Sequence, residues 1–157
     1  SSSLGGNMCP MLAGIGSILG EGIAGYFIDP DETQYSWGYL NGTAVHESTV
    51  IAQSANPYEL IVPNPKVAVL LDNGIASSGE VVAISFVGKE NAKSFGSPTC
   101  GLSTANEGFT LSSGCTLVLT TSYLADRNKK KYGIPVVPDK TSTNETIIQD
   151  AVTWIEE

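Results

Sequence analysis

The sequence predicts a mixed α/β domain, with a central mixed sheet flanked by helices. Three observations carry this prediction. Apolar residues recur at helical spacing near both ends of the chain, an apolar run that is continuous after Lys66 occupies residues 66–71, and alternating segments separated by turn signals lie on either side of that run. A chain of 157 residues with 41% hydrophobic and 15% charged residues suits one folded domain over residues 1–157.

The first element expected is a helix that starts after Asn7, a favourable N-cap, with Pro10 in its first turn. It should end at Gly20 or Gly22. Its apolar face has three- and four-residue spacing and consists of Met8, Met11, Leu12, Ile15, Ile18 and Leu19.

Strands and turns follow. Residues 23–45 are typical of strand, turn, strand and turn, with turn signals at residues 29–32 and at Asn41-Gly42. Residues 49–65 contain three prolines and are expected to be more loop than regular element. The apolar run at residues 66–71 is typical of a strand buried on both faces. The later expectations are a helix within 77–91, a strand at 92–97, a hairpin over 107–126 turning at 112–114, an extended segment at 133–140, and a closing helix within 143–157.

Charge and cysteine content exclude several functions. Eight basic and sixteen acidic residues give a net charge of −8, which repels phosphate backbones, so we expect no nucleic-acid partner. The three cysteines, Cys9, Cys100 and Cys115, form no C-x-x-C motif, and we expect them to be small buried side chains. We expect no metal and no cofactor.

Ser77, in the turn after the apolar run, has two interpretations. Ser77 and Glu80 fit a capping box, in which Ser77 accepts from the N–H of Glu80 and Glu80 returns a bond to the N–H of Ser77, at a gain of about 1 kcal/mol. A turn between a buried strand and a helix also exposes a serine hydroxyl as a nucleophile, close to backbone N–H groups that stabilise an oxyanion. The turn is not the G-x-S-x-G elbow, because Ile75 stands where the first glycine would be.

Residues 67–88 resemble the core motif of the carboxyl-terminal processing (tail-specific) serine peptidases, whose turn has the form T-A-S-[AS]-[AS]-E. Here the turn reads I-A-S-S-G-E at residues 75–80. Residues 4–22 resemble the end of the family's D-L-R-x-N-x-G-G strand and the following helix, residues 96–101 its G-E-x-T-x-G turn, and residues 109–139 its late hairpin and P-D element.

The resemblance implies a crotonase-like peptidase core with Ser77 as the nucleophile. It also implies an oxyanion hole formed by the N–H of Ser78 and that of Gly6, with Gly5 as the alternative, while Glu80 supports the turn. One branch of the family places a lysine base 25 residues after the serine, but position 102 is a leucine. The tricorn-like and nisin-resistance-like branch uses a histidine upstream of the G-G strand, and His46 is not at that position. Lys89 and Lys93 match no family position either.

We therefore expect the chain, which opens with S-S-S-L-G-G-N and no initiator methionine, to be the C-terminal part of a larger Ser–His peptidase core. By resemblance, its substrate is a peptide or protein and its location the bacterial cell envelope, with any membrane contact made through an upstream anchor. Two alternatives stay open: an esterase, and a non-catalytic binding module with a groove lined by four aromatic residues. These are Phe27, Tyr35, Trp37 and Tyr39.

Overall fold

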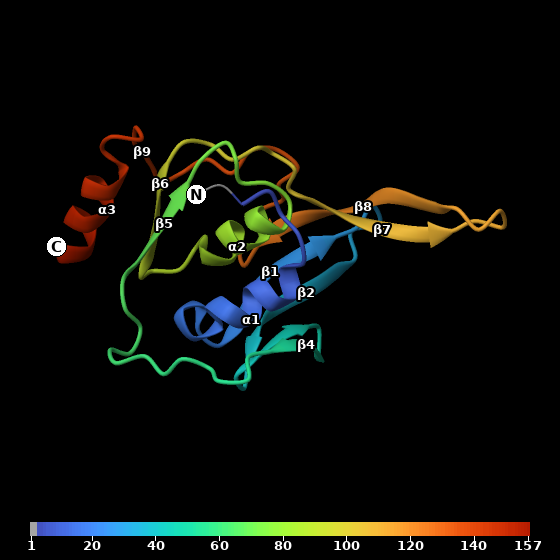
Figure 1. The fold of residues 1–157 in the computed structure, drawn as a ribbon, viewed down its shortest axis with the longest axis horizontal. Coiled ribbons are helices and arrows are strands. Elements are labelled where there is room, and N and C mark those ends of the chain that lie inside the picture. The colour runs from blue at the N-terminus through green and yellow to red at the C-terminus, as the bar shows by residue number, and fades with distance from the viewer. Residues whose placement is uncertain (1–2) are drawn as a thin grey trace.

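The computed structural model describes residues 3–157 and confirms the mixed α/β architecture (Figure 1). Its elements, in chain order, are α1 (Met8–Leu19), β1 (Gly22–Ile28), β2 (Gln34–Leu40), β3 (Thr43–His46), β4 (Thr49–Gln53), β5 (Val67–Leu71), α2 (Ser78–Phe86), β6 (Ala92–Gly96), β7 (Thr104–Thr110), β8 (Thr116–Asp126), β9 (Lys140–Thr141) and α3 (Ile147–Glu156). The strands divide between an antiparallel six-stranded sheet, ordered β4-β3-β2-β1-β8-β7, and a parallel three-stranded sheet, ordered β5-β6-β9.

The first helix forms as the sequence predicts. The side chain of Asn7 accepts a hydrogen bond from the N–H of Cys9 at 3.0 Å, which satisfies one of the free donors at the helix N-terminus. The helix ends at Gly20, whose φ of 79° suits a residue without a Cβ.

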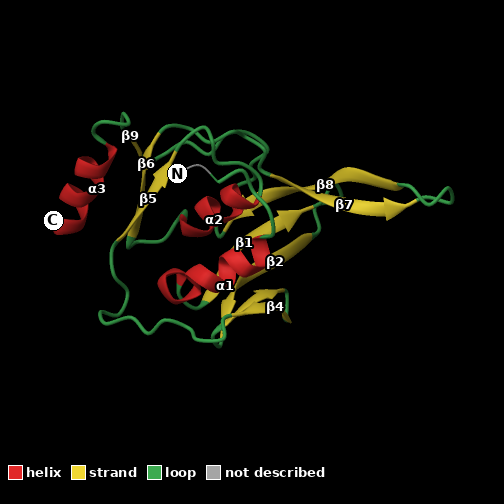
Figure 2. Ribbon diagram, in the orientation of Figure 1, coloured by secondary structure: helices red, strands yellow, loops and turns green. Residues whose placement is uncertain are grey.

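Helices α1 and α2 lie beside each other against the six-stranded sheet, and the three-stranded sheet stands between α2 and α3 (Figure 2). The main core fills the space between α1, α2 and the large sheet, with Leu12, Trp37, Ile84 and Leu124 at most 1% exposed. Gly16 allows α1 to approach this sheet closely, because a Cβ at that position would fall 1.9 Å from the ring of Tyr39.

Three local expectations were wrong. Residues 49–53 form strand β4, because pairing with β3 stabilises a segment whose prolines all come later. Strand β5 is not buried on both faces, since it lies at the edge of its sheet and Leu70 is 41% exposed. Two of the cysteines, Cys100 and Cys115, are exposed, and Cys9 is only partly buried.

The hairpin of β7 and β8 projects from the body of the molecule (Figure 1). Its outer half is exposed on both strands, whereas the end of β8, at Leu124–Asp126, is buried beside β1. The part of the hairpin near the body lies close to α2 and to the turn that precedes α2.

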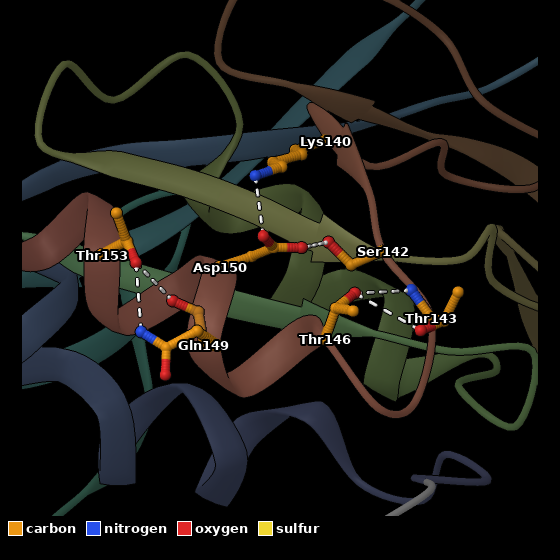
Figure 3. Close-up of polar contacts among 7 residues, drawn as sticks. All are labelled: Lys140, Ser142, Thr143, Thr146, Gln149, Asp150 and Thr153. Carbon is orange, nitrogen blue, oxygen red and sulfur yellow. Dashed lines mark hydrogen bonds and ion pairs between the residues drawn. The ribbon is translucent and has the colours of Figure 1, made fainter.

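Helix α3 is joined to the segment before it by polar contacts (Figure 3). The carboxylate of Asp150 accepts from the ammonium group of Lys140 at 2.8 Å and from the hydroxyl of Ser142 at 2.5 Å. The bond from Lys140 is the largest influence that lowers the pKa of Asp150. Within residues 3–157, no helix has the length and hydropathy needed to cross a bilayer.

Candidate active site around Ser77

The turn between β5 and α2 holds Ser77 in a strained conformation. Its φ of 54° and ψ of −121° lie outside the regions open to most residues other than glycine. Such strain costs on the order of 1–3 kcal/mol and is concentrated at functional sites. The side chain of Ser77 is half-buried, at the N-cap of α2.

Glu80 stabilises this turn through hydrogen bonds to Ser77. A capping box is present, in which Oε2 of Glu80 accepts from the N–H of Ser77 at 3.0 Å. The N–H of Glu80 also donates to the carbonyl oxygen of Ser77, at 2.8 Å. The capping interpretation is therefore compatible with Ser77 as a site residue, because the bond that Glu80 accepts from the N–H of Ser77 holds the backbone of the turn.

Glu80 is fully buried and also binds a second loop. Its Oε1 accepts from the hydroxyl of Thr99 at 2.6 Å and from the N–H of Gly101 at 2.8 Å. The hydroxyl of Thr99 in turn accepts from the N–H of Val136 at 2.8 Å. Both carboxylate oxygens are therefore engaged, and Glu80 joins the Ser77 turn to the loop of Thr99 and Gly101, which is itself bonded to Val136. The sequence suggested the Ser77–Glu80 pair, but not the partnership with Thr99 and Gly101.

The segment before α1 lies across the same turn. The N–H of Ala76 donates to the carbonyl oxygen of Ser3 at 2.9 Å, and the hydroxyl of Ser78 donates to the carbonyl oxygen of Gly6 at 2.7 Å. Gly5 is so close that a Cβ there would lie 2.9 Å from the Cβ of Ser77. The structure thus brings together all five predicted residues: Gly5, Gly6, Ser77, Ser78 and Glu80.

A cavity of about 330 Å³ opens beside Ser77. Gly6 and Ser78 line it, whereas Gly5 packs behind the serine instead. The N–H of Ser78, the first residue of α2, is one of the donors that a helix leaves unpaired at its N-terminus. The full lining is Gly6, Met8, Phe27, Ser77, Ser78, Val81, Thr104, Ala105, Asn106 and Leu124.

Within residues 3–157, the lining of this cavity includes no histidine, lysine or carboxylate. Leu102, 25 residues after Ser77, is 57% exposed. His46 lines a neighbouring cavity, and Lys89 and Lys93 line one between α2 and α3. Burial, followed by the charge of Arg127, lowers the pKa of Lys89. The site therefore has a strained serine and nearby N–H groups, but no base within its cavity.

Comparison with known proteins gives a consistent result. The model of peptidase family S41 matches residues 2–141. A nisin-resistance protein from Lactococcus lactis subsp. lactis is 30% identical over 154 residues, which is 96% of this chain and 46% of that protein. The chain therefore spans about half the length of this curated relative.

Two solved structures have similar folds. A lipoprotein from Streptococcus agalactiae superposes with a TM-score of 0.73 at 29% identity, over 98% of this chain and 52% of that one. The photosystem II D1 C-terminal processing protease superposes with a TM-score of 0.64 at 21% identity, over 90% of this chain and 33% of that one. The second likeness concerns the fold alone.

Proposed function

The chain belongs to peptidase family S41, and from this premise we propose that it carries the nucleophile half of a serine peptidase site that hydrolyses peptide bonds through Ser77. The observation that carries the proposal is the strained turn at Ser77, at the N-terminus of a helix and beside a cavity. A helix N-terminus favours the negative charge that develops when the hydroxyl attacks a carbonyl group.

The oxyanion hole in this proposal consists of two backbone N–H groups, those of Ser78 and Gly6. Both residues line the cavity beside Ser77, and the bond from the Ser78 hydroxyl to the Gly6 carbonyl fixes their separation. Gly5 is the alternative donor, and its contact with the Cβ of Ser77 supports a role in the close packing behind the nucleophile.

A serine requires a base to attack at neutral pH. We propose that this base, a histidine, comes from outside these 157 residues, and that the chain is the C-terminal part of a longer protein. Two observations support this: no basic side chain lines the Ser77 cavity within residues 3–157, and the chain matches only 46% of its relative's length. The chain alone should then have little peptidase activity.

The proposed substrate is the chain end of a peptide or protein, and a narrower form is the cleavage of a lantibiotic such as nisin. The nisin-resistance protein supports the narrower form through its 30% identity. The proposed location is a bacterial cell envelope, which is supported by the lipoprotein that shares 29% identity with the chain.

The test is labelling with a fluorophosphonate probe in the full-length protein, followed by mass spectrometry of the labelled peptide. We expect a single adduct at Ser77, none in Ser77→Ala, and unchanged labelling in Ser113→Ala, which removes a hydroxyl at the exposed hairpin tip. Adduct formation at another serine would refute the assignment. Turnover of peptides but not of simple esters then separates a peptidase from an esterase.

A second candidate is a non-catalytic binding module on the same scaffold. The observation that favours it is a larger cavity next to the Ser77 cavity, which Phe27 and Tyr35 line. Trp37 does not fit that proposal, because it is 1% exposed and its indole N–H donates to Ser85 in the core at 3.1 Å. Peptide binding without any labelling of Ser77 in the full-length protein would favour the module.

A further inference from the structure

A second cavity, of about 750 Å³, adjoins the one that holds Ser77. The two cavities share three lining residues, Phe27, Ala105 and Asn106. A peptide whose backbone lies at Ser77 would therefore have a neighbouring side chain within reach of this space. Its other lining residues include Asp29, Tyr35, His46, Glu107 and Thr121.

Aromatic rings form one wall of this second cavity. The ring of His46 lies 5.7 Å from that of Phe27 and 6.4 Å from that of Tyr35, with the second pair stacked at 23°. Behind them, Trp37 packs against Phe27 at 4.7 Å, which fixes the position of the phenyl ring. Aromatic faces held in this way attract a cation through the ring quadrupole.

Carboxylates supply the charge. Asp29 lines the cavity from the β1–β2 turn, where its Oδ1 accepts from the N–H groups of Asp31 and Thr33 at 2.9 and 2.8 Å. Glu107 lines it from β7, where the residue is exposed. No lysine or arginine from residues 3–157 lines the cavity, so its electrostatic potential favours a positive group.

One polar atom in the wall lacks a partner. The Oγ1 of Thr121 is buried and has no hydrogen-bond partner among the described residues. Because this atom is buried, a ligand in the cavity has no direct access to it, and recognition rests on the rings and the carboxylates.

We propose that this cavity is a specificity pocket that receives a lysine or arginine side chain close to the scissile bond of a peptide. The inference rests on the proposed function, because it takes Ser77 to mark the position of the bond that is cleaved. The stem of the side chain packs against Phe27 and Tyr35, and its charged end lies between Asp29 and Glu107. The edge position of β7 lets an extended peptide run past both cavities.

The test measures binding and needs no turnover. Short fluorescein-labelled peptides of alanine and serine carry one lysine, moved through each position in turn, and a matched series carries norleucine instead. Fluorescence anisotropy with the Ser77→Ala protein gives the dissociation constants. At one position we expect lysine to bind about tenfold more tightly than norleucine, from one cation–π contact and partly solvated ion pairs.

The double variant Asp29→Asn, Glu107→Gln should reduce this ratio to less than about twofold and weaken its dependence on salt. Asparagine keeps the acceptor that Asp31 and Thr33 use, so the turn should persist, which thermal unfolding checks. The control variant, Glu145→Gln, removes one negative charge close to α3 and should leave the ratio unchanged.

Equal binding of both series, tighter binding of norleucine, no binding of any peptide, or an unchanged ratio in the double variant would each overturn the proposal. Labelling of Ser77 by the fluorophosphonate probe is a separate result. Labelling without a lysine preference refutes the pocket alone, whereas a lysine preference without labelling leaves the pocket standing and refutes the peptidase.

Discussion

Replacement of Glu80 by glutamine tests whether one buried carboxylate holds the Ser77 turn. The wild-type side chain accepts from three donors, Ser77 on Oε2 and both Thr99 and Gly101 on Oε1. An amide has one oxygen, so its NH₂ group must face either the N–H of Ser77 or the N–H of Gly101. In the second arrangement the hydroxyl of Thr99 can accept from the NH₂ group beside its bond from Val136, but the N–H of Gly101 then has no acceptor. At least one buried donor is left unpaired in either orientation.

An unpaired buried donor costs about 1–3 kcal/mol, and bonds to a charged acceptor are stronger than those to a neutral one. We therefore expect Glu80→Gln to lower the free energy of unfolding by about 2–4 kcal/mol. For a chain of this size that corresponds to a fall in the urea midpoint of roughly 1–2 M.

Urea unfolding followed by circular dichroism measures the effect, with Glu145→Gln as a control that loses the same charge at an exposed position outside both cavities. Fluorophosphonate labelling of the full-length protein should slow in Glu80→Gln and stay the same in the control. A free energy of unfolding for Glu80→Gln within about 0.5 kcal/mol of the wild-type value would refute the argument that the carboxylate organises the turn.

Three further predictions concern the site and the pH dependence of stability. Gly5→Ala places a Cβ 2.9 Å from that of Ser77 at a φ of 98°, so we expect loss of Ser77 labelling and a lower melting temperature in thermal unfolding. The pKa of Asp150 is lowered, chiefly by its bond from Lys140, so the carboxylate stabilises the fold above the ordinary aspartate pKa of about 3.9, and this stabilisation is lost below it. The difference in urea midpoint between wild type and Asp150→Asn should therefore shrink as the pH falls from about 6 to about 2. Burial raises the pKa of Tyr132, so the stability that its neutral side chain contributes should be lost as the pH rises above the ordinary tyrosine pKa of about 10. In that range wild type should lose stability faster than Tyr132→Phe.

Local signals predicted the elements whose ends are set by neighbours in the sequence. Asn7 caps α1, Gly20 ends it, and residues 112–114 turn the β7–β8 hairpin, as their side chains or torsions require. In the same way, Ser77 and Glu80 are three residues apart and interact within one helical turn.

Contacts between distant parts of the chain determine the features that local sequence signals did not predict. The apolar run of β5 is equally consistent with a central or an edge strand, and only the tertiary structure places it at the sheet edge with Leu70 exposed. The bond from Gly101 to Glu80 joins residues 21 apart, through a loop with no periodic pattern. Likewise, Tyr35 and Glu107 face one cavity only because β8 lies between β1 and β7.

The contact between Ser78 and Gly6 joins residues 72 positions apart, so the site closes a loop over nearly half of the chain. The entropic cost of such closure is paid only when the intervening strands and helices have packed. The segment at residues 3–6 has no regular secondary structure and can therefore detach by local opening while the core remains intact. Hydrogen exchange at the N–H of Ala76, which donates to Ser3, should report this opening, and the lifetime of the closed state sets how long an assembled oxyanion hole persists.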